Sequence, residues 1–223
     1  MIIPAYNEEA SIGKVLEAIP AEPVREVVVV NNNSTDRTRE VAEYAGATVI
    51  DETRQGYGSA CLRGIAYLKA KENPPDTVVF LDADFSDYPE QMERLLTPIR
   101  DEGIDLTIGS RTLGKRSKGA LMPQQVFGNK LATWMMKALY GIRYTDLGPF
   151  RGIRFQKLLE LGMEDPDYGW TVEMQLKAAK MKLEVKEVPV DLRQRIGTSK
   201  VAGTFQGTVM AGYKIIKTIL SYR

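Results

Sequence analysis

Short runs of β-branched residues alternate with helical segments along the first half of the chain, and this alternation constrains the fold more than any other feature. The predicted strands 26–30 and 77–81 contain the apolar runs 27–30 and 78–81, which are typical of strands buried on both faces. Between such runs, apolar residues recur at helical spacing. Strands that alternate with helices through short connections form parallel sheets with right-handed crossovers. The pattern therefore predicts an α/β fold with a mostly parallel central sheet.

The same patterns predict elements along most of the chain. Strands are expected at residues 1–3, 26–30, 47–50, 77–81, 105–109 and 184–190, with a strand or hairpin at 144–154. Helices are expected at residues 12–19, 36–45, 58–71, 89–102, 124–140, 168–181 and 205–222. No repeat, low-complexity tract or linker interrupts them, so the 223 residues predict a single domain.

Composition narrows the chemistry that this chain can perform. It has no histidine and one cysteine, Cys61, which excludes Ser-His-Asp triads, His-ligated metals and intramolecular disulfides. Acid–base or metal chemistry must therefore rest mainly on carboxylates, and a single cysteine fits the reducing cytoplasm. A net charge of +1 argues against a nucleic-acid partner. No apolar run approaches the roughly 20 residues that cross a membrane.

Polar residues cluster where three predicted strands end. Asp82-Ala83-Asp84 follows the strand at 77–81, and segments 4–9 and 31–36 follow two other strands. Each segment alone has an ordinary explanation as turn and helix-cap residues. Together they are more specific, because the carboxyl ends of parallel strands meet at one edge of a sheet, where ligands bind.

The Asp82-Ala83-Asp84 segment predicts a metal site. A buried strand delivers both carboxylates to the sheet edge, and a divalent cation relieves the repulsion between them. Oxygen ligands suit Mg²⁺ or Mn²⁺, which share phosphate oxygens with one or two carboxylates. Asp84 is expected to be the main ligand and Asp82 a supporting one. Such a metal would neutralise charge that develops on a leaving diphosphate.

Six segments in a fixed order give the sequence a resemblance to a known family. They are Pro-Ala-Tyr-Asn-Glu-Glu at 4–9, Asn-Ser-Thr-Asp-Arg-Thr at 33–38, Gly56-x-Gly58-x-Ala60, Asp82-Ala83-Asp84, Gly109-Ser110-Arg111 and Gly197-x-Ser199-Lys200. Over nearly the whole chain they resemble glycosyltransferase family 2, on its dolichyl-phosphate mannose or glucose synthase branch. The resemblance implies a Rossmann-like three-layer sandwich of the GT-A type. It also implies a metal-dependent, inverting hexosyltransferase that uses a nucleotide-diphosphate sugar.

The resemblance assigns roles to individual residues. A UDP- or GDP-sugar is expected to bind the half formed by residues 1–111. Its implied contacts are Pro4, Tyr6, Glu8, Asn32, Asp36, Asp82, Ala83 and Asp84. The implied phosphate- or acceptor-binding residues are Arg111, Arg193, Arg195, Ser199 and Lys200. Both Arg193 and Arg195 stay in the set because Gln194 stands where relatives often carry an arginine. Residues 31–34, Asn-Asn-Asn-Ser, replace the family's usual Asp-Asp-Gly-Ser, which leaves the choice of base open.

The acceptor is expected to bind the half formed by residues 112–204, and the resemblance implies a polyprenyl phosphate of the dolichyl type. A soluble hydroxyl acceptor would need a carboxylate base, and Asp146 and Glu173 are the predicted catalytic candidates. A phosphate acceptor is already ionised near neutral pH, so these carboxylates would then only orient arginines. Their ordinary alternatives are a turn cap for Asp146 and a solvated helix carboxylate for Glu173.

Residues 205–223 predict a C-terminal amphipathic helix that carries Lys214 and Lys217. Its apolar stripe either packs on the protein's own core or lies on an anionic membrane surface. The second alternative suits a polyprenyl acceptor and places the protein at the periphery of the cytoplasmic membrane face. In the helix at 124–140, Trp134 is predicted to be a core residue.

Two rival functions share carboxylates at a sheet edge. A nucleotidyltransferase would also pair them with Mg²⁺, but such enzymes generally begin with a Gly-rich, basic loop that segment 4–9 lacks. A non-catalytic nucleotide-sugar-binding subunit would bind the donor without turnover. The intact Asp82 and Asp84 pair argues against that alternative.

Overall fold

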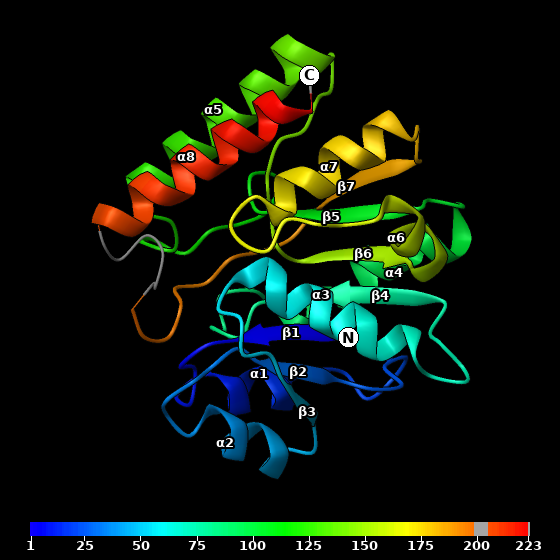
Figure 1. The fold of residues 1–223 in the computed structure, drawn as a ribbon, viewed down its shortest axis with the longest axis vertical. Coiled ribbons are helices and arrows are strands. Elements are labelled where there is room, and N and C mark those ends of the chain that lie inside the picture. Colours follow the sequence, from blue (N-terminus) through cyan, green and yellow to red (C-terminus); the bar gives the residue numbers. More distant parts are fainter. Residues whose placement is uncertain (199–204, 223) are drawn as a thin grey trace.

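A computed structural model describes residues 1–198 and 205–222 of the chain (Figure 1). Seven strands form one sheet in the order β3-β2-β1-β4-β6-β5-β7. The strands are β1 (Ile2–Ala5), β2 (Val28–Asn31), β3 (Thr48–Asp51), β4 (Thr77–Phe80), β5 (Leu106–Ser110), β6 (Arg151–Arg154) and β7 (Val185–Pro189). The helices are α1 (Ile12–Ala18), α2 (Thr38–Tyr44), α3 (Tyr57–Lys69), α4 (Met92–Asp101), α5 (Pro123–Tyr140), α6 (Phe155–Leu161), α7 (Trp170–Lys180) and α8 (Phe205–Ser221), with a 3₁₀ turn, η1 (Pro89–Gln91).

Strand β6 departs from the parallel arrangement, because it runs antiparallel to both β4 and β5. The remaining paired strands are parallel, which confirms the predicted mostly parallel sheet. Of the segment 144–154 predicted as a strand or hairpin, only residues 151–154 form a strand. The sequence did not predict α6, since seven residues directly after a strand give too few turns for a helical period to show.

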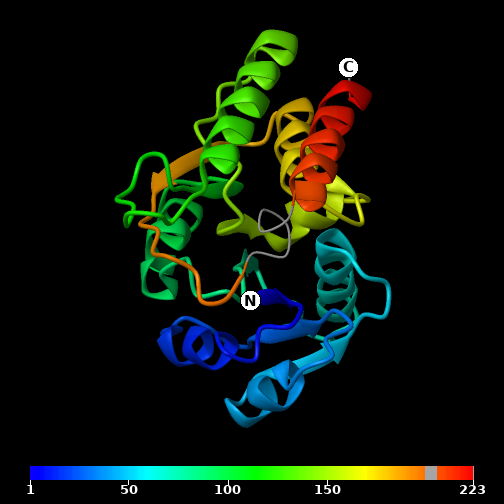
Figure 2. The same cartoon turned by 90° about the vertical axis from the view of Figure 1, so that its left-hand side faces the viewer.

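Helices cover both faces of the sheet, and each face has its own apolar core between the strands and the helices. On one face, Cys61 of α3 is buried, and Trp170 of α7 packs edge-on against Phe80 with ring centroids 5.9 Å apart. On the other face, Ile12 of α1 and Leu95 of α4 pack against the strands. Figure 2 shows α1 and α3 on opposite sides of the sheet. These layers form the predicted three-layer sandwich.

Helices α5 and α8 form a pair that packs on α7, away from the sheet (Figure 1). Met136, Val172 and Ile219 belong to the small core between these three helices. The other side of α5 is uncovered, and Phe127 and Trp134 are 68% and 64% exposed. The prediction that Trp134 is a core residue is therefore wrong. Helix α5 has apolar residues on more than one face, and only the face that carries Met136 meets a neighbour.

Candidate active site

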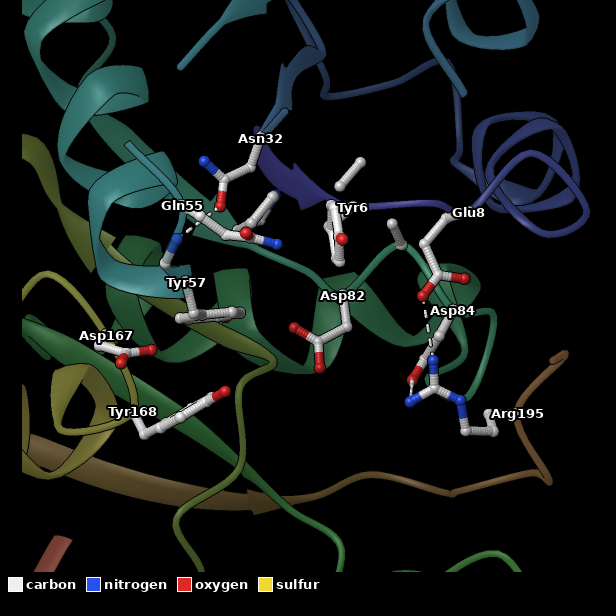
Figure 3. Close-up of a pocket in the computed structure, with 14 residues that line it drawn as sticks. Tyr6, Glu8, Asn32, Gln55, Tyr57, Asp82, Asp84, Asp167, Tyr168 and Arg195 are labelled. Carbon is white, nitrogen blue, oxygen red and sulfur yellow. Dashed lines mark hydrogen bonds and ion pairs between the residues drawn. The ribbon is translucent and has the colours of Figure 1, made fainter. Parts of the chain in front are cut away.

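A cavity of about 540 Å³ opens at the carboxyl edge of β1, β2 and β4 (Figure 3). The three polar segments that follow these strands meet there, as expected for parallel strands. The donor-binding residues expected from the sequence that line it are Pro4, Tyr6, Glu8, Asn32, Asp82, Ala83 and Asp84. From the phosphate-binding set, Arg195 lines it as well. Ser199 and Lys200 lie outside the described residues.

Asp82 and Asp84 follow β4 and reach the middle of the cavity. Asp82 Oδ1 is buried and has no hydrogen-bond partner among the described residues. Burial and the neighbouring charge of Asp84 raise the pKa of Asp82 to about 7. Asp84 is paired, because its Oδ2 lies 3.0 Å from Arg195 Nη1. The site therefore combines a buried carboxylate oxygen of Asp82 that has no partner among the described residues with the carboxylate of Asp84, which is ion-paired with the Arg195 guanidinium.

This pair of carboxylates fits Mg²⁺ or Mn²⁺, which prefer oxygen ligands. Within residues 1–198 and 205–222, no three cysteine or acidic side chains converge to form a complete metal site. A metal held by Asp82 and Asp84 would therefore take its remaining ligands from water or from phosphate oxygens. Such an open coordination shell is what a metal that clamps a diphosphate requires.

Residues 190–197 cross the loop that carries Asp84 and pair with its backbone. The N–H of Arg193 donates to the carbonyl of Ser86 at 2.9 Å, and the N–H of Ile196 donates to the carbonyl of Asp84 at 3.0 Å. These bonds bring the intervening side chain, Arg195, into the cavity. Backbone hydrogen bonds on either side of Arg195 therefore fix its position, in addition to the ion pairs of its side chain.

Arg193 and Arg195, which the sequence could not tell apart as phosphate-binding residues, have different surroundings. Arg195 bridges the polar segments, because its Nη2 also lies 3.0 Å from Glu8 Oε1. Arg193 does not line the cavity, donates to the carbonyls of Phe85 and Asp87, and stacks on the Phe85 ring at 3.3 Å. The structure therefore brings Arg195 to the cavity and gives Arg193 a role in holding the loop.

Arg111 and Asp146 form a buried ion pair next to the cavity. Asp146 is 1% exposed and accepts hydrogen bonds from Arg111 Nε at 2.8 Å and Nη2 at 2.7 Å. Burial acts to raise the pKa of Asp146, but the charge and hydrogen bonds of Arg111 outweigh it and lower that pKa. A carboxylate held in this way is a weak base. Its geometry is that of a group that orients Arg111.

Glu173 lies away from the cavity and is fully buried. Its oxygens accept the N–H groups of Glu164 and Asp165 at 2.9 and 2.7 Å, and Lys177 Nζ lies 2.8 Å away. It is not a solvated helix carboxylate, and it does not line the cavity as a predicted catalytic residue would. In this structure Glu173 anchors the loop that precedes α7.

Asn32 and Asp36 stabilise the loops around the cavity. Asn32 Oδ1 accepts the N–H of Gly56 at 2.8 Å, which fixes the start of α3 at the cavity wall. Asp36 accepts the N–H of Thr38 at 3.0 Å and that of Glu9 at 3.2 Å. Asp36 does not line the cavity. It joins the segment after β2 to the segment after β1.

Besides Ala5 of segment 4–9, five residues that the sequence did not assign to the site line the cavity. They are Gln55, Gly56, Tyr57, Asp167 and Tyr168. The first three lie in or beside the Gly56-x-Gly58 motif, which could have indicated them. Tyr57 carries a buried hydroxyl without a hydrogen-bond partner among the described residues. Asp167 and Tyr168 come from the loop before α7, and no local motif points to them.

A mostly parallel sheet of this order, with two acidic side chains at its carboxyl edge, defines an α/β protein with the GT-A fold. Among solved structures, the chain is similar to glucosyl-3-phosphoglycerate synthase of Mycobacterium tuberculosis in complex with Mn²⁺, UDP-glucose and phosphoglyceric acid. The TM-score is 0.78 at 24% identity, over 99% of this chain and 78% of that one. This likeness supports the fold.

The chain belongs to glycosyltransferase family 2 and is a glycosyltransferase: the profile of glycosyl transferase family 2 matches residues 1–162. It is 35% identical to an uncharacterized glycosyltransferase of Mycobacterium tuberculosis, over 95% of this chain and 93% of that protein. It is 31% identical to undecaprenyl-phosphate mannosyltransferase of Micrococcus luteus, over 92% and 88%. It is 32% identical to dolichyl-phosphate hexose transferase of Haloferax volcanii, over 100% and 94%.

Proposed function

We propose that this protein is a metal-dependent inverting glycosyltransferase that moves a hexosyl group from a UDP- or GDP-sugar to polyprenyl phosphate. The observation that carries the proposal is the unpartnered Asp82 Oδ1 beside Asp84 at the carboxyl edge of β4. The names of the Micrococcus luteus and Haloferax volcanii relatives support the acceptor class. The donor half is proposed to be residues 1–111, the acceptor half residues 112–204, and the membrane-facing helix residues 205–223.

Asp82 and Asp84 are proposed to hold Mg²⁺ or Mn²⁺, and Mn²⁺ is the ion bound in the structural relative. Bound there, the ion would supply charge neutralisation to the departing diphosphate. Glu8 keeps Arg195 at the same end of the cavity, where its N–H groups can donate to phosphate oxygens. Transfer breaks the bond from the anomeric carbon to the diphosphate and forms one to the acceptor oxygen, and a single displacement inverts the configuration.

The surroundings of the carboxylates in the acceptor half support a phosphate acceptor, which needs no base. Asp146 is committed to Arg111, and Glu173 is committed to backbone N–H groups and Lys177. Neither is placed to remove a proton, and an ionised phosphate needs no base. One observation favours a soluble hydroxyl acceptor instead, because Asp167 is a carboxylate of this half that does line the cavity.

A polyprenyl acceptor requires contact with a membrane, and α5 and α8 have the composition for it. Residues 112–143 and 205–223 together contain nine of the chain's 30 basic residues and none of its 29 acidic ones. Within the described residues, no helix is long and apolar enough to span a bilayer. We therefore propose peripheral contact between these helices and an anionic cytoplasmic membrane face, through exposed aromatic side chains and lysines.

The decisive experiment is transfer by purified protein with Mn²⁺, tested with UDP- and GDP-hexoses. Polyprenyl phosphate in anionic vesicles is compared with vesicles that contain the matching free polyprenol. Formation of a hexosyl-phosphoryl-polyprenol, detected by mass spectrometry together with the nucleoside diphosphate, is the expected result. Transfer to a hydroxyl acceptor alone would establish the alternative, and binding of donors without any transfer would refute the proposed reaction.

A further inference from the structure

The loop of residues 163–169 joins α6 to α7 and reaches the cavity from the second half of the molecule. Asp167 and Tyr168 lie at its tip and line the wall across from Asp82 (Figure 3). Both side chains point into the cavity from this wall. The first half of the chain supplies the remaining lining residues apart from Arg195. The tip is therefore the main contribution of the second half to this cavity.

The loop is fixed to the first half of the molecule by close packing against α3. The N–H and the hydroxyl of Ser59 both donate to the carbonyl of Pro166, at 2.8 and 3.1 Å. A Cβ atom at Gly58 would lie 1.9 Å from the carbonyl oxygen of Asp165, and one at Gly56 would lie 2.3 Å from that of Pro166. Only glycine permits this approach at the two positions. The Gly56-x-Gly58 motif thus allows the loop of residues 163–169 to pack closely against α3.

Two carboxylates hold the loop from within the second half. Glu173 accepts the N–H groups of Glu164 and Asp165. Asp165 in turn accepts the N–H of Asp167 at 2.8 Å, and its Oδ2 lies 3.8 Å from Lys214 Nζ. The tip of the loop is therefore constrained on both sides. A polar group held this firmly at a cavity wall can select between ligands that differ in the position of one hydroxyl.

Asp167 differs from Asp165 and Glu173 because no side chain of the described residues donates a hydrogen bond to its carboxylate. The backbone N–H of Tyr168 donates to this carboxylate, which keeps further lone pairs that can accept hydrogen bonds from a ligand. A phosphate group would be repelled by this carboxylate, whereas the hydroxyls of a neutral sugar are donors that match it. The ring of Tyr168 beside it offers an apolar surface for the C–H face of such a sugar.

We propose that Asp167 determines which sugar the enzyme transfers, by accepting hydrogen bonds from hydroxyls of the donor's hexosyl ring. The proposal rests on the proposed function, in which Asp82 and Asp84 hold the diphosphate through a metal. The hexosyl ring is bonded directly to that diphosphate, so it lies next to Asp82. Asp167 and Tyr168 form the opposite wall of the space that this ring would fill (Figure 3).

The test compares binding of a nucleoside diphosphate with binding of the matching nucleotide hexose, by calorimetry with Mn²⁺. UDP with UDP-glucose and GDP with GDP-mannose are the two pairs. For each protein, the affinity for the nucleotide hexose divided by that for the nucleoside diphosphate isolates the effect of the sugar. Asp167→Asn should lower this ratio about tenfold or more, the usual effect of weakening a hydrogen bond to a charged group. It should leave binding of the nucleoside diphosphate unchanged.

Glu164→Gln is the matched control, because Glu164 lies on the same loop with 83% of its side chain exposed. It should leave both affinities at wild-type values. Asp167→Asn should also reduce discrimination between UDP-glucose and its epimer UDP-galactose. An unchanged affinity ratio in Asp167→Asn overturns the proposal, and a loss of kcat with that ratio intact overturns it in favour of a proton-accepting role. Failure of the wild-type protein to bind either nucleoside diphosphate would instead overturn the proposed function.

Discussion

The two halves of the molecule present opposite kinds of surface. In the first half, polar side chains follow buried strands and are held in fixed positions, as Glu8 and Asp84 are by their ion pairs with Arg195 of the second half. In the second half, α5 and α8 expose apolar side chains among basic residues, with no carboxylate on either helix. Binding at a site of fixed polar geometry depends on the positions of single atoms. Binding through a surface of scattered apolar and basic side chains depends on the sum of many small contributions. Substitutions in the two halves should therefore differ in both kind and size.

The largest effect is expected at Asp84. Asp84→Asn should reduce transfer by on the order of 10²-fold or more, because a neutral amide cannot hold the cation against a developing diphosphate charge. Initial rates at saturating donor, together with Mn²⁺ binding measured by electron paramagnetic resonance, check this expectation. Asp101→Asn, at the exposed end of α4, should keep wild-type values for both. Wild-type turnover of Asp84→Asn with every donor would remove the metal from the proposed mechanism.

The chain's two tryptophans, both in the second half, compare a side chain that packs against the sheet with one on the uncovered face of α5. Trp170 is 1% exposed and packs against Phe80, so Trp170→Ala should lower the free energy of unfolding by about 3–5 kcal/mol. Trp134 is 64% exposed, so Trp134→Ala should change it by no more than about 0.5 kcal/mol. Urea denaturation followed by circular dichroism measures both values. Equal losses in the two variants would mean that α5 is packed as tightly as α7.

A somewhat smaller loss of stability is expected at the ion pair beside the cavity. Asp146→Asn should cost roughly 3 kcal/mol, because it leaves the Arg111 charge, with its side chain 17% exposed, without its partner. The pKa of Asp146 is lowered in the folded state, so its ionised form stabilises the fold above its unfolded pKa of about 4. This contribution disappears as the pH falls through the folded pKa.

Urea titrations from pH 7 to pH 3 check the expectation for Asp146. The difference in unfolding free energy between wild type and Asp146→Asn should narrow as the pH drops below about 4. A difference that stays constant over this range would show that the lost energy comes from packing and that the charge pair contributes little.

The contrast between the halves also explains what could be predicted from the sequence. Buried strands such as 77–81 have a composition that marks them, and parallel topology brings their ends together, so Asp82 and Asp84 were found together at one edge of the sheet. Asp167 does not follow a strand of recognisable composition, so no signal in the sequence indicated it. It reaches the cavity because the backbone of Pro166 packs on α3, a contact between residues 107 positions apart. No local pattern encodes a contact of that range.

Burial of charged and aromatic side chains was the least predictable property. Helix propensity and periodicity placed Glu173 near a helix start, but not the backbone N–H groups that fold back onto its carboxylate. In the same way, the apolar period of residues 124–140 predicted a helix correctly and assigned Trp134 to the core wrongly. A periodic stripe predicts a helix with an apolar face, without showing whether other parts of the chain pack on that face.

The smallest effects are expected on the proposed membrane-contacting surface of α5 and α8, where many residues share the binding free energy. Phe127→Ala and Trp134→Ala should each weaken binding to anionic vesicles about tenfold, since each removes about 1–2 kcal/mol of apolar burial. Vesicle sedimentation at several salt concentrations measures this, and binding should fall as salt rises because lysines contribute. Tyr44→Ala is the matched control, an aromatic residue 97% exposed on α2 of the first half. If Tyr44→Ala weakens vesicle binding as much as Trp134→Ala does, the membrane contact is not confined to the second half.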